Sequence, residues 1–426
     1  MEHKAESRVK VKEENKMKKL QDKLIEVGNK LATQRHLQSI SFGLMAIMPL
    51  TIFGSIFQLI SALPDIFPFI PSYSETIKDA ILFPYNMVFG LFGVIAVCAI
   101  AYYHARTYKL DLLQAPIVSL LSFIVLAAPI VDNNMDATYL GSQGIFLAIF
   151  VALVTVEIMQ LLKRRNIQIK LPDSVPPAVA ASFDAIIPMC LIVAGFYGLS
   201  LLCQNFTGML LPSWIMSLLT PAIQGSESLW FCMLMAFIIA FLQFLGVHGF
   251  NVVSGIILPL LIANTGANAA AYAAGETATK IFTLPMFQMS GVFCYIIPLL
   301  FLKCKSERLR SMGKISIVPA IFNIAEPIQY GAPIMFNPIL GIPWIAFYTI
   351  NMGIIWCCMN FGIMGKAVIA ASSNIPMPFF QYLCTLDWRA VLIFVVMFIV
   401  SGLIWYPFIK VYDKKCLDEE NNLQAE

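Results

Sequence analysis

The chain has 426 residues, of which 59% are hydrophobic and only 12% are charged, against about 25% charged residues in ordinary soluble domains. This composition excludes a soluble globular protein and predicts an all-α protein that crosses the membrane many times. The net charge of +3 is small, and the basic residues lie at the ends of apolar segments, so nucleic acid is excluded as a partner.

The first 38 residues are rich in Lys and Glu and lack the apolar region of a secretory signal peptide. We expect residues 1–38 to form a cytoplasmic, partly amphipathic segment. The ten cysteines and four histidines show no spacing typical of a disulfide framework or a metalloenzyme. We therefore expect no metal and no cofactor, and the absence of a Gly-rich nucleotide loop indicates that ATP is not bound here.

Ten segments approach the length of about 20 apolar residues that a spanning helix needs. They are residues 39–63, 85–104, 112–130, 144–162, 182–204, 229–247, 250–264, 281–302, 345–365 and 389–409. When these alternate from a cytoplasmic N-terminus, the basic segments 102–109, 163–170, 303–314 and 410–415 all fall on the cytoplasmic side, as the positive-inside rule requires. Both termini, including a tail at 410–426, are thus predicted to be cytoplasmic.

The first half of the membrane region, residues 39–204, contains few intramembrane ionisable groups apart from Glu157 and Asp184. These lie beside a basic loop and a Pro-rich connector, where we expect them to pair. Apolar helices that face lipid or another subunit suit a dimer interface. Residues 39–204 are therefore predicted to be a scaffold and dimerisation bundle, and residues 205–409 a transport domain.

A polar island interrupts the apolar run at "FLQFLGVHGFNVVSG", with Gln243, His248 and Asn251. Gly246 and Gly249 flank the histidine and allow a bend and a close backbone approach. We expect His248 at a break between two spans, facing a binding site. The alternative is a neutral core histidine that donates to a carbonyl.

The segment "NTGANAAAYAAGETATK" (264–280) is rich in Gly and Ala and offers little to bury. It is predicted to be a flexible outer loop that gates the transport domain. The alternative is a short surface helix.

Residues 315–343 begin and end on the cytoplasmic face in this topology, and they contain five prolines and a single carboxyl group, Glu326. Proline breaks continuous spanning helices, so a re-entrant hairpin is predicted. Non-helical backbone at membrane depth lines cavities where transporters hold substrate, and intramembrane carboxyl groups are functional by default. Glu326 is expected in the site, unless it only braces backbone freed by Pro327.

The chain resembles the membrane subunit, enzyme IIC, of the bacterial phosphoenolpyruvate-dependent sugar phosphotransferase system, in its lactose, cellobiose and diacetylchitobiose family. The resemblance covers nearly the whole chain after the N-terminal segment. It is carried by "YLGSQGIFLAIFVALVTVEI" (139–158), "LPDSVPPAVAASFDAIIP" (171–188), "GVHGFN" (246–251), "FNIAEPIQYGAPIMFNPILGIPW" (322–344) and residues 387–414. It implies a homodimeric, multi-pass protein of the bacterial cell membrane, in contact with lipid, that carries sugar by moving its transport domain.

The resemblance also implies site roles. His248 matches the histidine of the family's Gly-x-His-Gly element, and Glu326 matches the glutamate of its Asn-Glu-Pro element. Both are expected to contact sugar, with Glu326 accepting the proton of the hydroxyl that is phosphorylated. Gln243, Asn251 and Asn323 are expected to be further sugar contacts.

The phosphoryl donor is expected on a separate cytosolic enzyme IIB, supplied by IIA, because no domain of this chain could carry the phosphoryl group. The chain departs from the family at Ala325, where Asn is usual, at Gln243, where some members have Trp, and at "SSNIPMP" (372–378), which lacks another Trp. The sugar, a disaccharide or other glycoside, therefore stays open. Two alternatives remain: an ion-coupled secondary sugar transporter that uses Glu326 and His248 as proton carriers, and a non-transporting membrane sensor.

Overall fold

The structure is a computed structural model that describes residues 26, 30, 33–66, 69–131, 134–167, 169, 172, 175, 183–291, 293–325, 327–328, 334–335 and 337–425. The described residues are overwhelmingly helical. Within them the strands are limited to β1 (Ile130–Val131) and β2 (Asn134–Met135), which pair antiparallel. The predicted all-α class is confirmed, and almost all of the predicted segment 1–38 lies outside the described residues.

The first group of helices surrounds a buried apolar core. It comprises α2 (Arg35–Ser61), α3 (Leu63–Ile66), α4 (Glu75–Gly90), α5 (Phe92–Tyr108), α6 (Gln114–Ala127), the 3-10 turn η1 (Ser142–Gly144), α7 (Ile145–Arg164) and α9 (Ile186–Thr207). Helix α5 packs against α2, α6 and α7, and α6 packs against α9. Small residues allow these contacts. At Gly43 of α2, for example, an added Cβ atom would clash with α5, because it would lie only 2.8 Å from the Cα atom of Ile100.

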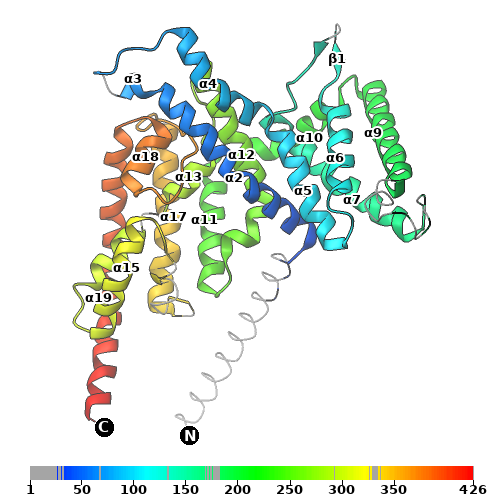
Figure 1. Cartoon of the computed structure of the whole chain (residues 1–426). Helices are drawn as coiled ribbons and strands as arrows, with labels where there is room; N and C mark the ends of the chain where they lie inside the picture. Colours follow the sequence, from blue (N-terminus) through cyan, green and yellow to red (C-terminus); the bar gives the residue numbers. More distant parts are fainter. Residues whose placement is uncertain are drawn as a thin grey trace.

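The second group follows in the sequence. It comprises α10 (Leu211–Ser226), α11 (Leu229–Phe244), α12 (Gly249–Ala273), α13 (Leu284–Met289), α14 (Phe293–Phe301), α15 (Glu307–Ile321), α17 (Pro338–Asn360), α18 (Met377–Thr385) and α19 (Arg389–Ala425). Of these, α13, α17 and α18 lie on the other side of α2 from α5, α6 and α9 in Figure 1, whereas α10 lies beside α6 and α9. Helix α17 packs between α11 and α19, and α14 packs against α15 and α19.

Helix α2 connects the two groups, because it packs against α4 and α5 on one side and against α12 on the other. The contact with α12 is close: a Cβ atom at Gly255 would lie 2.8 Å from the carbonyl oxygen of Leu37. Nearby, the buried hydroxyl groups of Ser41 and Ser254 lie 2.7 Å apart and share a hydrogen bond.

Among the described residues, six helices are long and apolar enough to span a membrane, and eight spans result if each of two bent pairs counts as one. The bent pairs are α4 with α5, at 42°, and α10 with α11, at 79°. Ten spans remain a prediction. Two predicted spans are wrong as continuous helices: residues 85–104 cross the break between α4 and α5 at Leu91, and residues 281–302 contain two short helices, α13 and α14, with Gly291 outside both.

The prolines of residues 315–343 interrupt the helices less than we expected. Pro319 lies in the last turn of α15, Pro338 is at the first position of α17, and Pro343 lies inside α17. Proline is tolerated in a first helical turn, where its missing N–H would have no intrahelical partner. The structure therefore has helix at both ends of this segment and non-helical backbone at residues 322–325.

The prediction of a flexible gate at residues 264–280 is wrong for its first ten residues, which continue α12 to Ala273. Asn264 and Asn268 are buried. The side chain of Asn264 donates to the carbonyl oxygen of Phe282, and that of Asn268 donates to the carbonyl oxygen of Ala367, at 2.8 and 2.9 Å. Small residues here permit close packing rather than motion, since a Cβ atom at Gly266 would lie 2.7 Å from Ser142 Oγ.

The last helix extends well past the apolar segment, so residues 410–425 continue α19 (Figure 1). Asp413 accepts hydrogen bonds from the backbone N–H groups of Lys305 and Ser306, at 2.9 and 2.8 Å. Glu420 accepts from the backbone of Arg308 at the start of α15, at 3.0 Å. Carboxylates stabilise a helix N-terminus, and these bonds hold the loop before α15 on the same side of the membrane as the end of α19.

Candidate functional site

A cavity of about 360 Å³ lies where α2, α11, α12, α13, α17 and α18 converge. This volume falls in the range of small-molecule sites. Its lining residues are Met45, Met48, Ile239, Gln243, His248, Phe250, Leu258, Leu284, Phe287, Gln288, Ser290, Gly291, Asn323, Ala325, Tyr348, Ser373 and Met377. Three of the predicted site residues, Gln243, His248 and Asn323, thus share one cavity.

The predicted break at His248 is present. Helix α11 ends at Phe244 and α12 begins at Gly249. Gly246 has a φ of 78°, which a glycine adopts without steric cost. A Cβ atom at Gly249 would lie 2.1 Å from the carbonyl oxygen of Ile239, so a larger residue there would push α12 away from α11.

His248 is the N-cap residue of α12, where its Nδ1 atom accepts the backbone N–H of Asn251 at 3.4 Å. The neutral ring therefore carries its proton on Nε2, which leaves a donor for a ligand. Asn251 itself is exposed and is not among the residues that line the cavity. Its role as a sugar contact stays a prediction.

Asn323 combines a structural contact with an unpaired acceptor. Its φ of 59° is a left-handed conformation that Asn tolerates. Its side-chain nitrogen donates to the carbonyl oxygens of Ser373 and Ile375, at 2.6 and 2.7 Å. These two bonds fix the amide orientation, while the Oδ1 atom is buried with no hydrogen-bond partner.

The Oε1 atom of Gln243 is likewise buried without a hydrogen-bond partner. An unpaired buried acceptor costs about 1–3 kcal/mol, so donor groups of a ligand would relieve both sites. Gln243, His248 and Asn323 place amide groups and a ring N–H in the cavity wall, and such groups suit a polyhydroxylated molecule, because each hydroxyl group both donates and accepts.

Sequence reasoning missed several lining residues. Phe250 and Phe287, whose ring centroids lie 6.1 Å apart, and Tyr348 supply aromatic surface that the missing Trp residues led us not to expect. Gln288 and Ser290 interrupt the apolar run "LPMFQMSG" and could have been found by the signal that revealed Gln243. The contributions of Met45 and Met48 from α2 have no such signal.

Glu326 lies outside the described residues, so the structure gives no position for the predicted carboxylate. The preceding residue, Ala325, lines the cavity, and Ile328, two residues further on, is buried.

Comparisons with known proteins agree with one another. The family model "Phosphotransferase system, EIIC" matches residues 41–347. The chain is 32% identical to the lichenan permease IIC component of Bacillus subtilis (strain 168), with 95% of each chain covered. It is 31% identical to the lactose-specific EIICB component of Lacticaseibacillus casei, with coverage of 95% of this chain and 72% of that one.

A solved structure is also similar, the crystal structure of the transporter ChbC, the IIC component from the N,N'-diacetylchitobiose-specific phosphotransferase system. Its TM-score is 0.89 at 30% sequence identity, and the match covers 94% of this chain and 99% of that one.

Proposed function

Because the chain belongs to the EIIC family of the phosphotransferase system and is a sugar permease component of that system, we propose that the cavity around Gln243, His248 and Asn323 binds a disaccharide. The relatives named for lichenan, lactose and cellobiose support this substrate class. The observation that carries the proposal is the pair of buried acceptors, Gln243 Oε1 and Asn323 Oδ1, that lack partners in the protein.

Each polar group has a distinct task in this proposal. The two amide oxygens accept hydrogen bonds from sugar hydroxyl groups, and the Nε2–H of His248 donates to a hydroxyl or ring oxygen. Phe250, Phe287 and Tyr348 present apolar surface to the C–H faces of the sugar rings.

Glu326, next to the lining residue Ala325, is proposed to accept the proton of the hydroxyl that is phosphorylated. A sugar hydroxyl is a weak nucleophile, and a positioned base accelerates its attack on phosphorus. The Glu-Pro match to the family supports this role.

EIIC components work with IIB and IIA proteins, and we propose that the IIB partner of this chain is a separate cytosolic protein. The Lacticaseibacillus casei relative is an EIICB component of which this chain covers 72%, so the IIB part can be fused to IIC or separate from it. We further propose that residues 39–204 form the scaffold of a homodimer, that residues 205–409 carry the sugar, and that both termini are cytoplasmic.

The test uses inside-out membrane vesicles that contain this chain, supplied with the soluble phosphotransferase proteins, a candidate IIB and phosphoenolpyruvate. A panel of labelled disaccharides is offered, with monosaccharides as the control. We expect disaccharide phosphate to form only when both IIB and this chain are present. Protonophore-sensitive uptake without phosphorylation would instead identify an ion-coupled transporter, and no uptake or binding of any sugar would identify a sensor.

A further inference from the structure

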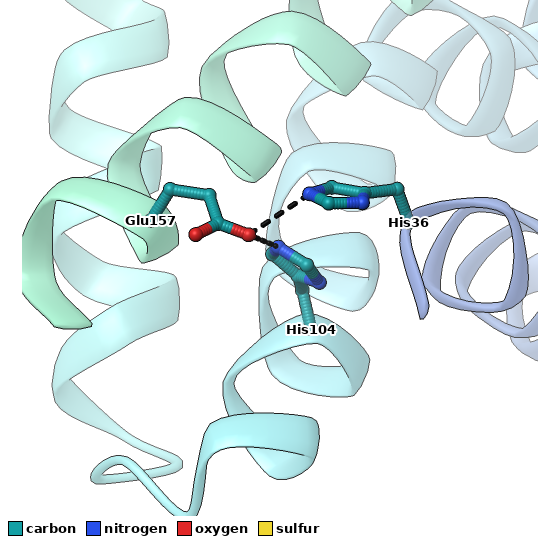
Figure 2. Close-up of side chains that lie close together, drawn as sticks. All are labelled: His36, His104 and Glu157. Atoms are coloured by element: carbon teal, nitrogen blue, oxygen red, sulfur yellow. Dashed lines mark hydrogen bonds and ion pairs between the residues drawn. The ribbon is translucent and has the colours of Figure 1, made fainter. Parts of the chain in front are cut away.

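Three ionisable side chains that do not line the proposed sugar cavity meet on the helices α2, α5 and α7 (Figure 2). The Nε2 atoms of His36 and His104 lie 2.8 and 3.2 Å from the same carboxylate oxygen, Oε1 of Glu157. Glu157 was expected to pair with the adjoining basic loop, but it contacts these two rings instead. The proposed sugar chemistry uses none of the three residues.

The hydrogen bonds of His104 define which ring nitrogen carries its proton. The ring is fully buried, and its Nδ1 atom lies 3.0 Å from Ser39 Oγ. The Ser39 hydroxyl donates its own hydrogen to the carbonyl oxygen of Arg35, at 2.7 Å, so Nδ1–H must be the donor to Ser39. In a neutral ring the Nε2 lone pair then faces the Glu157 carboxylate, and a cation between them would turn this repulsion into attraction.

Glu157 is placed to act as an anionic ligand. Its Oε1 atom accepts the hydroxyl hydrogen of Tyr108 at 2.6 Å and the Nε2–H of His36 at 2.8 Å, and it also faces the Nε2 atom of His104. Two imidazole nitrogens and one carboxylate oxygen are a donor set that Zn²⁺ uses when a fourth position stays open to water. The three donor atoms all lie within 4.8 Å of one another, so small side-chain movements bring them to the bond lengths of about 2.0–2.2 Å typical of zinc.

The surroundings of His104 match those of a metal ligand. Zinc-bound histidines usually donate their second ring N–H to a protein oxygen, which fixes the ring, and Ser39 provides that oxygen here. Access is also available, because the side chains of His36 and Glu157 are 38% and 39% exposed.

Two neighbours oppose the binding of a cation. The Nδ1 atom of His36 accepts from the side-chain nitrogen of Gln34 at 2.8 Å, while the Gln34 oxygen caps the backbone of Leu37 at 2.7 Å. Coordination through His36 Nε2 moves the ring proton to Nδ1, so the exposed Gln34 amide must turn over. The guanidinium of Arg35, 4.9 Å from the centroid of the Tyr108 ring, adds a positive charge nearby.

We propose that His36, His104 and Glu157 bind one Zn²⁺ ion, which fastens the start of α2 to α5 and α7. The three ligands are far apart in sequence: Glu157 follows His36 by 121 positions and His104 by 53. No local motif can reveal such a site. The competing explanation is that no metal binds and that hydrogen bonds alone hold His36, His104 and Glu157 together.

The test measures zinc binding by the full-length protein, purified in detergent and stripped with a chelator. Titration calorimetry with ZnCl₂ and elemental analysis after dialysis are expected to give one zinc per chain. His36→Gln should leave folding intact, because His36 is partly exposed. It is expected to weaken zinc binding at least about a hundredfold, since it removes a direct ligand rather than a residue that only orients one. His248→Gln is the matched control and should bind zinc as the unmodified protein does.

A second variant tests the role of Ser39. Ser39→Ala removes the oxygen that fixes His104 and is expected to weaken zinc binding about 10- to 100-fold. It should also alter the visible spectrum of bound Co²⁺, which reports the ligand geometry. Failure of the unmodified protein to bind zinc at micromolar concentration, or unchanged binding by His36→Gln or Ser39→Ala, would overturn the proposal.

Discussion

Gln243 and Asn323 both line the proposed sugar cavity and both have a buried, unpaired amide oxygen, yet the two side chains differ in what else they do. The side-chain nitrogen of Asn323 donates to the backbone carbonyl oxygens of residues 373 and 375, whereas the side chain of Gln243 makes no such bond to the described backbone. Substitutions at these positions should therefore separate sugar binding from stability.

We predict that Gln243→Leu weakens disaccharide binding about two- to tenfold, the worth of one neutral hydrogen bond, with little loss of thermal stability. Asn323→Leu should weaken binding and also lower the melting temperature, because two carbonyl oxygens lose their donor. Calorimetric binding and thermal unfolding in detergent measure both effects. Gln58→Leu is the control, since Gln58 has a buried, unpartnered Oε1 atom outside the cavity and its side-chain nitrogen contacts Ala269, which does not line the cavity; it should not affect sugar binding.

Glu326→Gln should separate binding from chemistry. Gln keeps the shape and hydrogen-bonding capacity of the side chain, so disaccharide binding is expected to stay within a few-fold. Phosphorylation should fall by about 10² to 10⁴, the usual contribution of a positioned general base. His248→Ala should instead reduce binding and turnover together. Normal phosphorylation by a membrane-inserted Glu326→Gln protein would leave Glu326 with only a bracing role.

Asp387 gives the loop between α18 and α19 a pH-dependent stability. Partial burial alone would raise its pKa, but hydrogen bonds from Arg389 and from the backbone of Gly365 outweigh burial and hold the pKa below its ordinary value. A lowered folded-state pKa contributes stability that is present above the unfolded pKa of about 3.9 and is lost as the pH falls through the folded value.

We therefore predict that Asp387→Asn lowers the free energy of unfolding by about 1 kcal/mol at neutral pH. The effect is small because solvent screens the charge of the half-exposed Arg389. The difference from the unmodified protein should shrink below about pH 4. Thermal unfolding in detergent across this range measures it, and a deficit that is constant with pH would show that the charge of Asp387 is irrelevant.

At the scale of elements, α2 belongs to the scaffold by its contacts with α4 and α5 and to the cavity through Met45 and Met48. Its close contact with α12 is consequential, because α12 begins beside His248. A change in the distance between α2 and α12 should therefore alter the shape of the proposed sugar site, although no lining residue is substituted.

Gly255→Ala tests this connection. The added Cβ atom would meet the backbone of Leu37 at 2.8 Å, and overpacking of this kind typically costs about 1–3 kcal/mol. We expect a lower melting temperature and weaker disaccharide binding. Gly198→Ala on α9 is the matched control, because its Cβ atom would have nothing within 4 Å. Equal melting temperatures and equal disaccharide binding in the two variants would show that the contact between α2 and α12 does not control the sugar site.

At the scale of the whole molecule, the bonds of Asp413 and Glu420 to residues 305–308 tie two predicted cytoplasmic segments together. The two segments must lie on the same face of the membrane, and their excess of Lys and Arg predicts that this face is cytoplasmic. Cysteines introduced at the exposed positions Lys303 and Lys415 should react with an impermeant maleimide in inside-out vesicles but not in intact cells. Labelling of either position in intact cells would invert the topology.

The dimer is a separate prediction at this scale. Apolar side chains such as Leu191, Leu202 and Phe206 are exposed on α9, in the proposed scaffold, and need lipid or a second copy to cover them. We expect disulfide cross-linking in native membranes to capture dimers through cysteines placed in residues 39–204 and not in 205–409. Capture of monomers alone would contradict the dimer.

The sequence by itself determined the features that depend on local chemistry. Hydropathy indicated the membrane class, because apolar helices are favoured there whatever their partners. Gly246 and Gly249 predicted the break before α12, because positive φ and close backbone approach are properties of glycine itself. The polar island with Gln243 and His248 predicted a cavity for the same local reason, that polar groups in an apolar segment need partners.

Only the tertiary structure decided features that depend on distant partners. Residues 264–273 resemble a flexible loop in isolation, yet they are helical, and one face is buried where Asn268 bonds to Ala367, 99 residues away. Asn323 was predicted as a sugar contact, but its side-chain nitrogen donates to the carbonyl oxygens of Ser373 and Ile375. His36 and Glu157 become neighbours only when α2 packs near α7. In each case burial and pairing are set by which helices pack together, and neither residue type nor local spacing contains that information.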